Sequence, residues 1–116
     1  MDIESLQDDD PLKVYLRELG TIQPLTKSEE SELWKKTEGE QQELAKRPLI
    51  ESQLLLVVAI AERYSSSGYS ILDLIQQGNL GLMRAIDTFV ESSGNDFPAY
   101  AASLIEDSIC KFARAK

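Results

Sequence analysis

The segment at residues 70–89, SILDLIQQGNLGLMRAIDTF, spaces its apolar side chains along one helical face. At about 100° per residue, that face collects Ile71, Leu74, Ile75, Gly78, Leu82, Ala85, Ile86 and Phe89. A helix with so wide an apolar stripe is stable when the stripe packs against other elements. The segment therefore predicts a helix seated in a core, and it constrains the chain towards a packed helical fold.

The opposite side of this helix, here called the outer face, mixes apolar with polar side chains. It consists of Asp73, Gln76, Leu80, Met83 and Asp87. Single apolar side chains are normal on a protein surface, but leucine and methionine clustered among carboxylates and amides are unusual on a face that meets only water. We interpret the outer face as a docking surface for another macromolecule.

Two glycines, Gly78 and Gly81, lie inside this helical pattern. Each costs roughly 1 kcal/mol relative to alanine. Either the backbone of a partner approaches closely here, or the helix packs tightly within the domain or breaks in two. Packing within the domain is favoured for Gly78, which lies on the core face, whereas the alternatives stay open for Gly81 on the flank.

Further helices are indicated by capping residues and apolar stripes. Asp10 followed by Pro11 is typical of a helix start, and Thr26 with Glu29 matches a capping box. A broad apolar stripe follows Pro48, and no segment alternates with period two. We predict an all-α fold, a compact bundle of about five helices in a single domain over residues 1–116. The helices are expected near residues 10–19, 27–38, 48–65, 71–89 and 97–113.

The net charge of −8 argues against strong independent binding to nucleic acid, because such affinity comes mostly from neutralising phosphates. The acidity is concentrated in residues 1–40, which hold 11 acidic and 5 basic side chains. No apolar run approaches the roughly 18 residues of a membrane helix, and the acidic start lacks the features of a signal peptide. With a lone cysteine, Cys110, these features predict a soluble cytoplasmic protein without a membrane partner.

Catalytic chemistry is not expected. The chain has no histidine, so the usual general base and zinc ligand are absent. It has no glycine-rich phosphate loop, and Cys110 falls on a helix predicted to pack. We therefore predict no catalytic residue, no metal site and no cofactor, and a protein that is not an enzyme.

Two long segments resemble the primary sigma factors of bacterial RNA polymerase, the sigma-70 family. Residues 10–30, DPLKVYLRELGTIQPLTKSEE, resemble region 1.2, and residues 47–89 resemble regions 2.1 and 2.2. A weaker match continues from residue 92 to residue 112. The resemblance implies an all-helical fold like sigma region 2, with a region 1.2-like part at 1–40 and a region 2.1–2.3-like part at 48–116. Regions 3 and 4 are expected to be absent, and with them the −35 reader.

The resemblance also implies a polymerase contact. In the family, the region 2.2 helix docks on the clamp helices, a coiled coil of the polymerase β′ subunit. Gln77 stands where the family usually has glutamate, and Asn79 falls nearer the core flank than the outer face. The residues expected to bind polymerase are Asp73, Gln76, Gln77, Asn79, Leu80 and Met83.

The promoter-reading part departs from the family pattern. In the family, the helix after region 2.2 captures bases of the −10 promoter element by aromatic stacking and phosphate contacts. Phe89 and Tyr100 stand where the family has aromatics, and with Lys111 they are the candidates for residual DNA binding. At nine other positions the family usually has a tryptophan, a basic residue or a polar residue, and this sequence has a different one. These residues are Leu55, Glu62, Ser92, Ser93, Asp96, Ser103, Leu104, Glu106 and Asp107.

These departures leave two interpretations open, simple drift in a divergent sigma factor or loss of DNA melting with retained polymerase docking. We favour the second. The leading hypothesis is a sigma-type protein that binds core RNA polymerase, either as a working promoter-recognition fragment or as an adaptor or competitor. Promoter DNA would then be bound weakly or only within the holoenzyme. The alternative is an interaction module that binds an anti-sigma factor, another regulator or its own copy.

Overall fold

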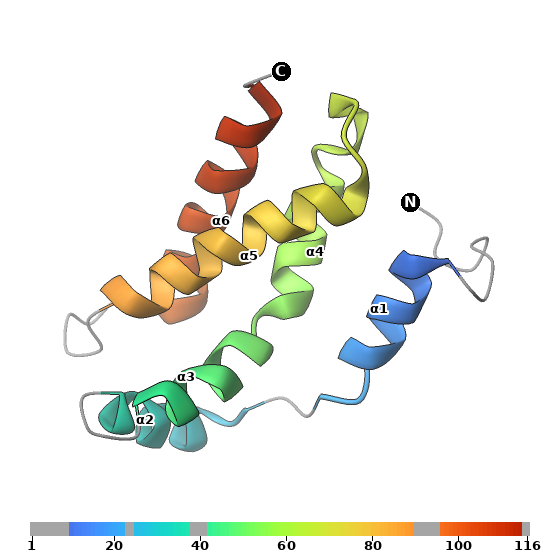
Figure 1. The fold of residues 1–116 in the computed structure, drawn as a ribbon. Coiled ribbons are helices and arrows are strands. Elements are labelled where there is room, and N and C mark those ends of the chain that lie inside the picture. Colours follow the sequence, from blue (N-terminus) through green and yellow to red (C-terminus); the bar gives the residue numbers. More distant parts are fainter. Residues whose placement is uncertain (1–9, 23–24, 38–41, 90–95, 115–116) are drawn as a thin grey trace.

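The computed structural model describes residues 10–22, 25–37, 42–89 and 96–114, and all regular structure in these ranges is helical. The all-α prediction is confirmed, although the described residues form six α-helices and not five (Figure 1). The helices are α1 (Pro11–Leu19), α2 (Lys27–Lys36), α3 (Gln42–Glu51), α4 (Leu54–Glu62), α5 (Ile71–Thr88) and α6 (Phe97–Arg114), with a 3₁₀ turn, η2 (Ser65–Ser67), after α4.

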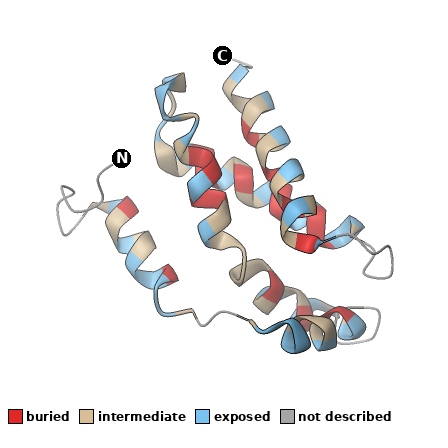
Figure 2. Ribbon diagram, turned by 180° about the vertical axis from the view of Figure 1, so that it is seen from behind, coloured by how far each residue is buried: buried red, intermediate tan, exposed pale blue. Residues whose placement is uncertain are grey.

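The core lies where α4, α5 and α6 meet. In Figure 1, α5 runs obliquely across α4 and α6, and Figure 2 shows the buried positions concentrated where these helices face one another. Each large apolar side chain buried there contributes about 1.5–3 kcal/mol relative to exposure. The largest fully buried side chains are Leu49, Val57, Ile60, Leu74, Leu82, Ile105 and Ile109. Burial along α5 follows the predicted apolar face, with Ile71 and Phe89 only partly buried.

The prediction of one helix over residues 48–65 is wrong. Helix α3 begins at Gln42 and contains Pro48, and the chain turns at residues 52–53 before α4 starts. Pro48 has no N–H to donate to the carbonyl four residues earlier, which weakens the helix. The hydroxyl of Ser52 donates to the carbonyl of Leu49 over 2.7 Å. It therefore competes for this acceptor with the backbone N–H groups that would continue the helix. The apolar spacing runs through the turn, so it could not reveal the break.

Two of the predicted helix starts, those at Asp10 and Thr26, are confirmed by their caps. The carboxylate of Asp10 accepts the N–H of Leu12 at 2.9 Å. Thr26 Oγ1 accepts the N–H of Glu29 at 3.1 Å, and the Glu29 carboxylate accepts the N–H of Thr26 at 3.0 Å. The hydrogen bond from the Thr26 backbone holds the pKa of Glu29 below its ordinary value.

An aromatic cluster joins α2 to the junction between α5 and α6. Its centre is Trp34, a buried residue of α2 whose ring centroid lies 5.0 Å from that of Phe89 and 4.9 Å from that of Phe97. Tyr100 extends the cluster, with its ring 5.5 Å from Phe89. Tilted and edge-on ring pairs at such distances are favourable beyond their buried area. The cluster therefore holds α2 against the helices that carry the candidate site.

Candidate functional site

The outer face of α5 is exposed along its whole length, as its periodicity predicts. Asp73, Gln76 and Asp87 are exposed, and Leu80 and Met83 retain 54% and 49% of their accessible surface. Only five large apolar side chains are exposed among the described residues, and two of them lie on this one face. Because the opposite side of α5 is buried in the core, the outer face is a rigid surface available to a partner.

Both glycines of α5 are explained by packing within the domain. A Cβ on Gly78 would lie 2.6 Å from Val57 Cγ1 and 2.9 Å from Ile109 Cδ1. A Cβ on Gly81 would lie 2.5 Å from the carbonyl oxygen of Leu104, in the backbone of α6. Gly81 is buried and does not lie on an open flank. The glycines therefore let α4 and α6 approach the inner side of α5, and the outer face needs no glycine.

Two residues expected to bind polymerase lie at the edges of the outer face. Gln77 and Asn79 are both partly buried, and the position of Asn79 agrees with the core flank inferred from helical spacing. The Oδ1 atom of Asn79 is buried and has no hydrogen-bond partner among the described residues. Leaving such an acceptor unsatisfied costs about 1–3 kcal/mol, so a donor from water or a partner would be favourable at this position.

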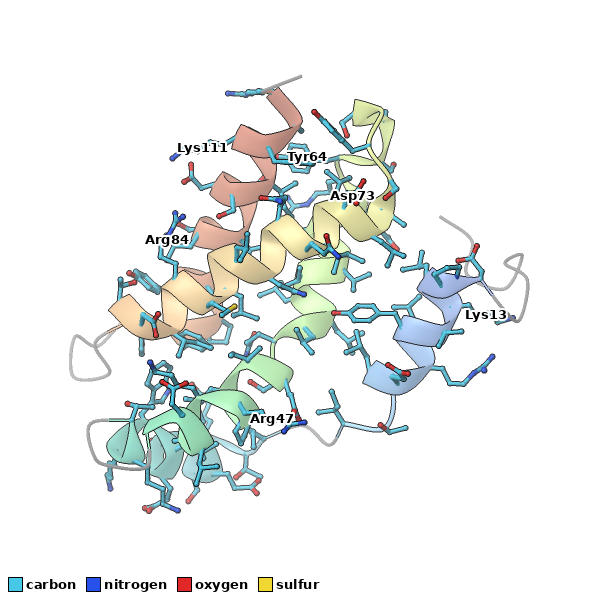
Figure 3. All side chains as sticks on the ribbon, viewed as in Figure 1. Lys13, Arg47, Tyr64, Asp73, Arg84 and Lys111 are labelled. Atoms are coloured by element: carbon cyan, nitrogen blue, oxygen red, sulfur yellow. The ribbon has the colours of Figure 1, made fainter. Side chains whose placement is uncertain are left out.

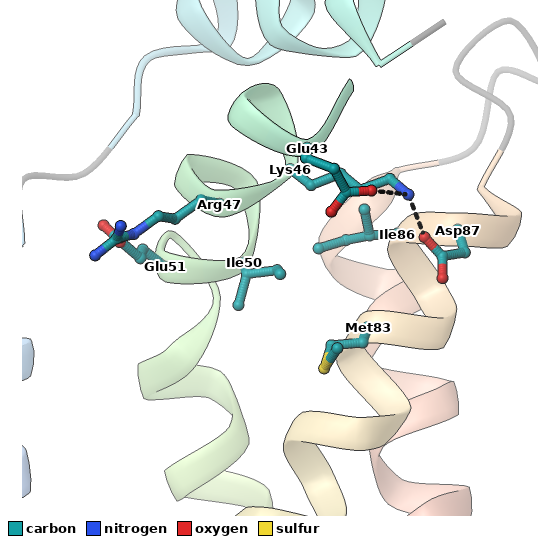
Figure 4. Close-up of a pocket in the computed structure, with 8 residues that line it drawn as sticks. All are labelled: Glu43, Lys46, Arg47, Ile50, Glu51, Met83, Ile86 and Asp87. Atoms are coloured by element: carbon teal, nitrogen blue, oxygen red, sulfur yellow. Dashed lines mark hydrogen bonds and ion pairs between the residues drawn. The ribbon is translucent and has the colours of Figure 1, made fainter. Parts of the chain in front are cut away.

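A cavity of about 460 Å³ separates the outer face from α3 (Figure 4). Its apolar wall comes from Met83, Ile50 and Ile86. On its rim, Lys46 Nζ lies 2.8 Å from Asp87 Oδ1, and this interaction raises the pKa of Lys46 above its ordinary value. The ion pair ties α3 to the last turns of α5, so Asp87 has a partner within the domain.

The candidate DNA-binding aromatics already have packing roles. Phe89 contacts the rings of Trp34, Phe97 and Tyr100. The hydroxyl oxygen of Tyr100 lies 2.7 Å from Thr88 Oγ1. The side chains of Phe89 and Tyr100 are partly buried. Base stacking would have to compete with these contacts, and a role of either ring in DNA binding stays a prediction.

Lys111, the third DNA-binding candidate, is exposed and lies 3.1 Å from Asp107 Oδ2. Its charge is therefore partly compensated by an acidic residue of the same helix. DNA binding by Lys111 also stays a prediction.

Two of the acidic substitutions stabilise the fold. Glu106 accepts a hydrogen bond of 3.0 Å from the Tyr64 hydroxyl and lies 3.8 Å from Arg63. Burial, followed by this hydrogen bond, raises the pKa of Tyr64. Asp96 accepts the N–H of Ala99 at 3.1 Å at the start of α6. Sequence reasoning missed the contacts that Glu106 and Asp96 make within the fold. Two other departures from the family pattern, Ser92 and Ser93, lie outside the described residues.

Neither a metal centre nor a membrane span is found in the part of the chain that the structure describes. No group of three or more histidine, cysteine, aspartate or glutamate side chains is gathered there in a way that could hold an ion. Of the helices described, none combines the length and hydropathy needed to cross a bilayer.

The family model for sigma-70 region 2 matches residues 49–116, which include α4, α5 and α6. The chain belongs to the sigma-70 family. It is 41% identical over 111 residues to the RNA polymerase sigma factor SigA of Lactococcus lactis subsp. cremoris and, over the same length, to that of Lactococcus lactis subsp. lactis strain IL1403. These matches cover 94% of this chain but only 30% and 29% of the two relatives, so the chain spans about a third of their length.

Membership in the sigma-70 family confirms the resemblance found in the sequence and is consistent with the all-helical fold. The outer face lies within the matched segment, on the helix that is most central to the core.

Proposed function

We propose that this sigma-70 family chain binds core RNA polymerase through the outer face of α5, which docks on the clamp helices of the β′ subunit. The observation that carries the proposal is the exposure of Asp73, Gln76, Leu80 and Met83 along one side of a helix whose other side is buried. The names of the relatives, RNA polymerase sigma factors, support polymerase as the partner.

The chemistry of the outer face suits a helical protein partner. Leu80 and Met83 are half exposed, and fully burying such a side chain contributes about 1.5–3 kcal/mol. The carboxylate of Asp73 and the amide of Gln76 flank them and can set the register of a partner helix. Interfaces of this kind draw most of their affinity from a few central residues.

We also propose that recognition and melting of −10 promoter DNA are weakened or lost. Leu55 is 60% exposed where a cation is usual, and Ser103 is exposed where an aromatic ring is usual. Glu106 and Asp107 retain about half of their side-chain exposure and bring negative charge to the surface that would meet phosphates. Such a chain would act as an adaptor or competitor on polymerase, with DNA bound weakly or only within the holoenzyme.

Binding of the full chain to cognate core RNA polymerase tests the first proposal. We expect Asp73→Ala with Gln76→Ala to weaken binding by a few kcal/mol, since central interface residues typically cost more than about 1 kcal/mol each when truncated. Leu44→Ala is the matched control, because Leu44 is 76% exposed on α3. Unchanged affinity in the double variant would refute docking through the outer face. Failure of the parent to bind polymerase, with capture of an anti-sigma factor, would favour the interaction module.

A further inference from the structure

A second hollow borders the outer face on the side of α6. Its volume is about 290 Å³. Helix α5 and helix α6 each supply one apolar wall residue, Leu80 and Phe112. Each also supplies one cation, Arg84 and Lys111, and Figure 3 shows both projecting on the same side of the molecule. Gln77 and Ser108 complete the lining.

The two cations are available to a partner. Arg84 is exposed and takes part in no ion pair with any other described residue. Lys111 pairs with Asp107 over 3.1 Å, but the Lys111 side chain is 74% exposed and that of Asp107 48%. Ion pairs at the surface contribute only about 0–1 kcal/mol. Two cations, Arg84 and Lys111, line the hollow and one carboxylate, Asp107, borders it, so the hollow is locally positive in a chain whose net charge is −8.

The combination of cations and apolar wall selects the kind of partner. A guanidinium binds a carboxylate through two parallel hydrogen bonds, and the apolar walls can receive an aliphatic side chain one turn away. A nucleic acid would need many phosphate contacts for comparable affinity, whereas this hollow offers few cations and has Asp107 at its edge. An acidic, amphipathic protein helix is favoured on both counts.

We propose that the hollow between α5 and α6 receives an acidic turn of the polymerase helix that docks on the outer face. A carboxylate of that turn lies between Arg84 and Lys111, and a neighbouring apolar side chain packs on Leu80 and Phe112. The inference rests on the proposed function, because Leu80 belongs both to the outer face and to this hollow. It adds the chemistry of the partner and a second helix, α6, to the interface.

The test measures binding of the full chain to core RNA polymerase at low and at high salt. Arg84→Gln with Lys111→Gln should weaken binding at low salt by about tenfold, since two exposed charge pairs together contribute on the order of 1.4 kcal/mol. The same variant should show a flatter salt dependence than the parent. Lys35→Gln with Lys36→Gln is the matched control, because it removes two exposed charges from α2, one of them paired with Glu32 at 3.7 Å. Circular dichroism and thermal melting confirm that each variant folds.

The outcomes separate the two proposals. If the variant of Asp73 and Gln76 loses polymerase binding while that of Arg84 and Lys111 keeps the parent's affinity and salt dependence, this inference is wrong and docking stands. If the Arg84 and Lys111 variant instead loses affinity only for single-stranded DNA, the hollow serves nucleic acid and the inference is also wrong. A parent that does not bind polymerase overturns both proposals.

Discussion

Replacing Gly81 with alanine tests the packing of α5 against α6 directly. The new Cβ would lie 2.5 Å from the carbonyl oxygen of Leu104, 2.7 Å from Ser108 Oγ and 3.0 Å from the Cα of Ile105. The serine hydroxyl can rotate away, but the other two atoms belong to the α6 backbone. Relief therefore requires α6 to move as a unit, and α6 is anchored in the core by Ile105 and Ile109, neither of which is exposed.

The magnitude follows from two opposed effects. Alanine is favoured over glycine in a helix by about 1 kcal/mol, whereas overpacking a core typically costs about 1–3 kcal/mol. Because the clash at Gly81 involves backbone, we expect the upper part of that range and a net loss of about 2 kcal/mol. For a domain of this size the melting temperature should fall by on the order of 10 °C.

The matched control is Gly20→Ala at the end of α1. Gly20 is exposed with φ of −65°, and a Cβ there would lie 3.4 Å from its nearest neighbour, the carbonyl oxygen of Arg17. We expect this change to stabilise the chain by about 0.4–1 kcal/mol through the unfolded state. Thermal and urea unfolding followed by circular dichroism measure both variants. A Gly81→Ala chain as stable as the parent would refute the argument that close approach of α6 requires glycine.

Three further predictions concern the aromatic cluster, the capping box at the start of α2, and DNA binding. Trp34→Ala should lower the free energy of unfolding in urea by about 3–5 kcal/mol, because it empties the centre of the cluster that joins α2 to α5 and α6. Only a small decrease in that free energy would show that the cluster does not hold α2. The capping hydrogen bond lowers the pKa of Glu29 on folding from its ordinary value of 4.5. The ionised carboxylate therefore stabilises the chain above pH 4.5, and this contribution is lost as the pH falls through the lower pKa of the folded state. Glu29→Gln should flatten the dependence of stability on pH at the acid end, and identical curves for variant and parent would contradict this. Single-stranded −10 DNA should bind the parent chain poorly at physiological salt. Ser103→Trp with Asp107→Gln should raise the affinity for this DNA, by about 1–3 kcal/mol for each stacked base. Micromolar, sequence-specific binding by the parent would contradict the proposed loss of promoter reading.

Local signals made much of the fold predictable. The caps at Asp10 and Thr26 act within one helical turn, so their residues identify the helix starts without knowledge of the rest of the fold. The apolar spacing of residues 71–89 likewise separated a buried side of α5 from an exposed side. Residues of the candidate site on the outer face were predictable for the same reason, because exposure along a single helix follows from its period.

Signals that depend on competition between local preferences were harder to read. Pro48 suggested a helix start, but it lies inside α3, and the break at residues 52–53 falls within an unbroken apolar pattern. Proline is tolerated there because the rest of α3 still packs, with Leu49 fully buried. Periodicity records which side of a helix is buried and does not record where the backbone turns.

By itself, the sequence determined the helical class, the sigma-70 resemblance and the two sides of α5, all of which depend on contiguous residues. Only the tertiary structure decided which residues meet across the fold. It decided that Gly81 faces the backbone of α6, that Lys46 pairs with Asp87, and that Phe89 packs on Trp34. Each of these contacts joins separate helices, and its geometry depends on how those helices cross, which no local period or cap specifies.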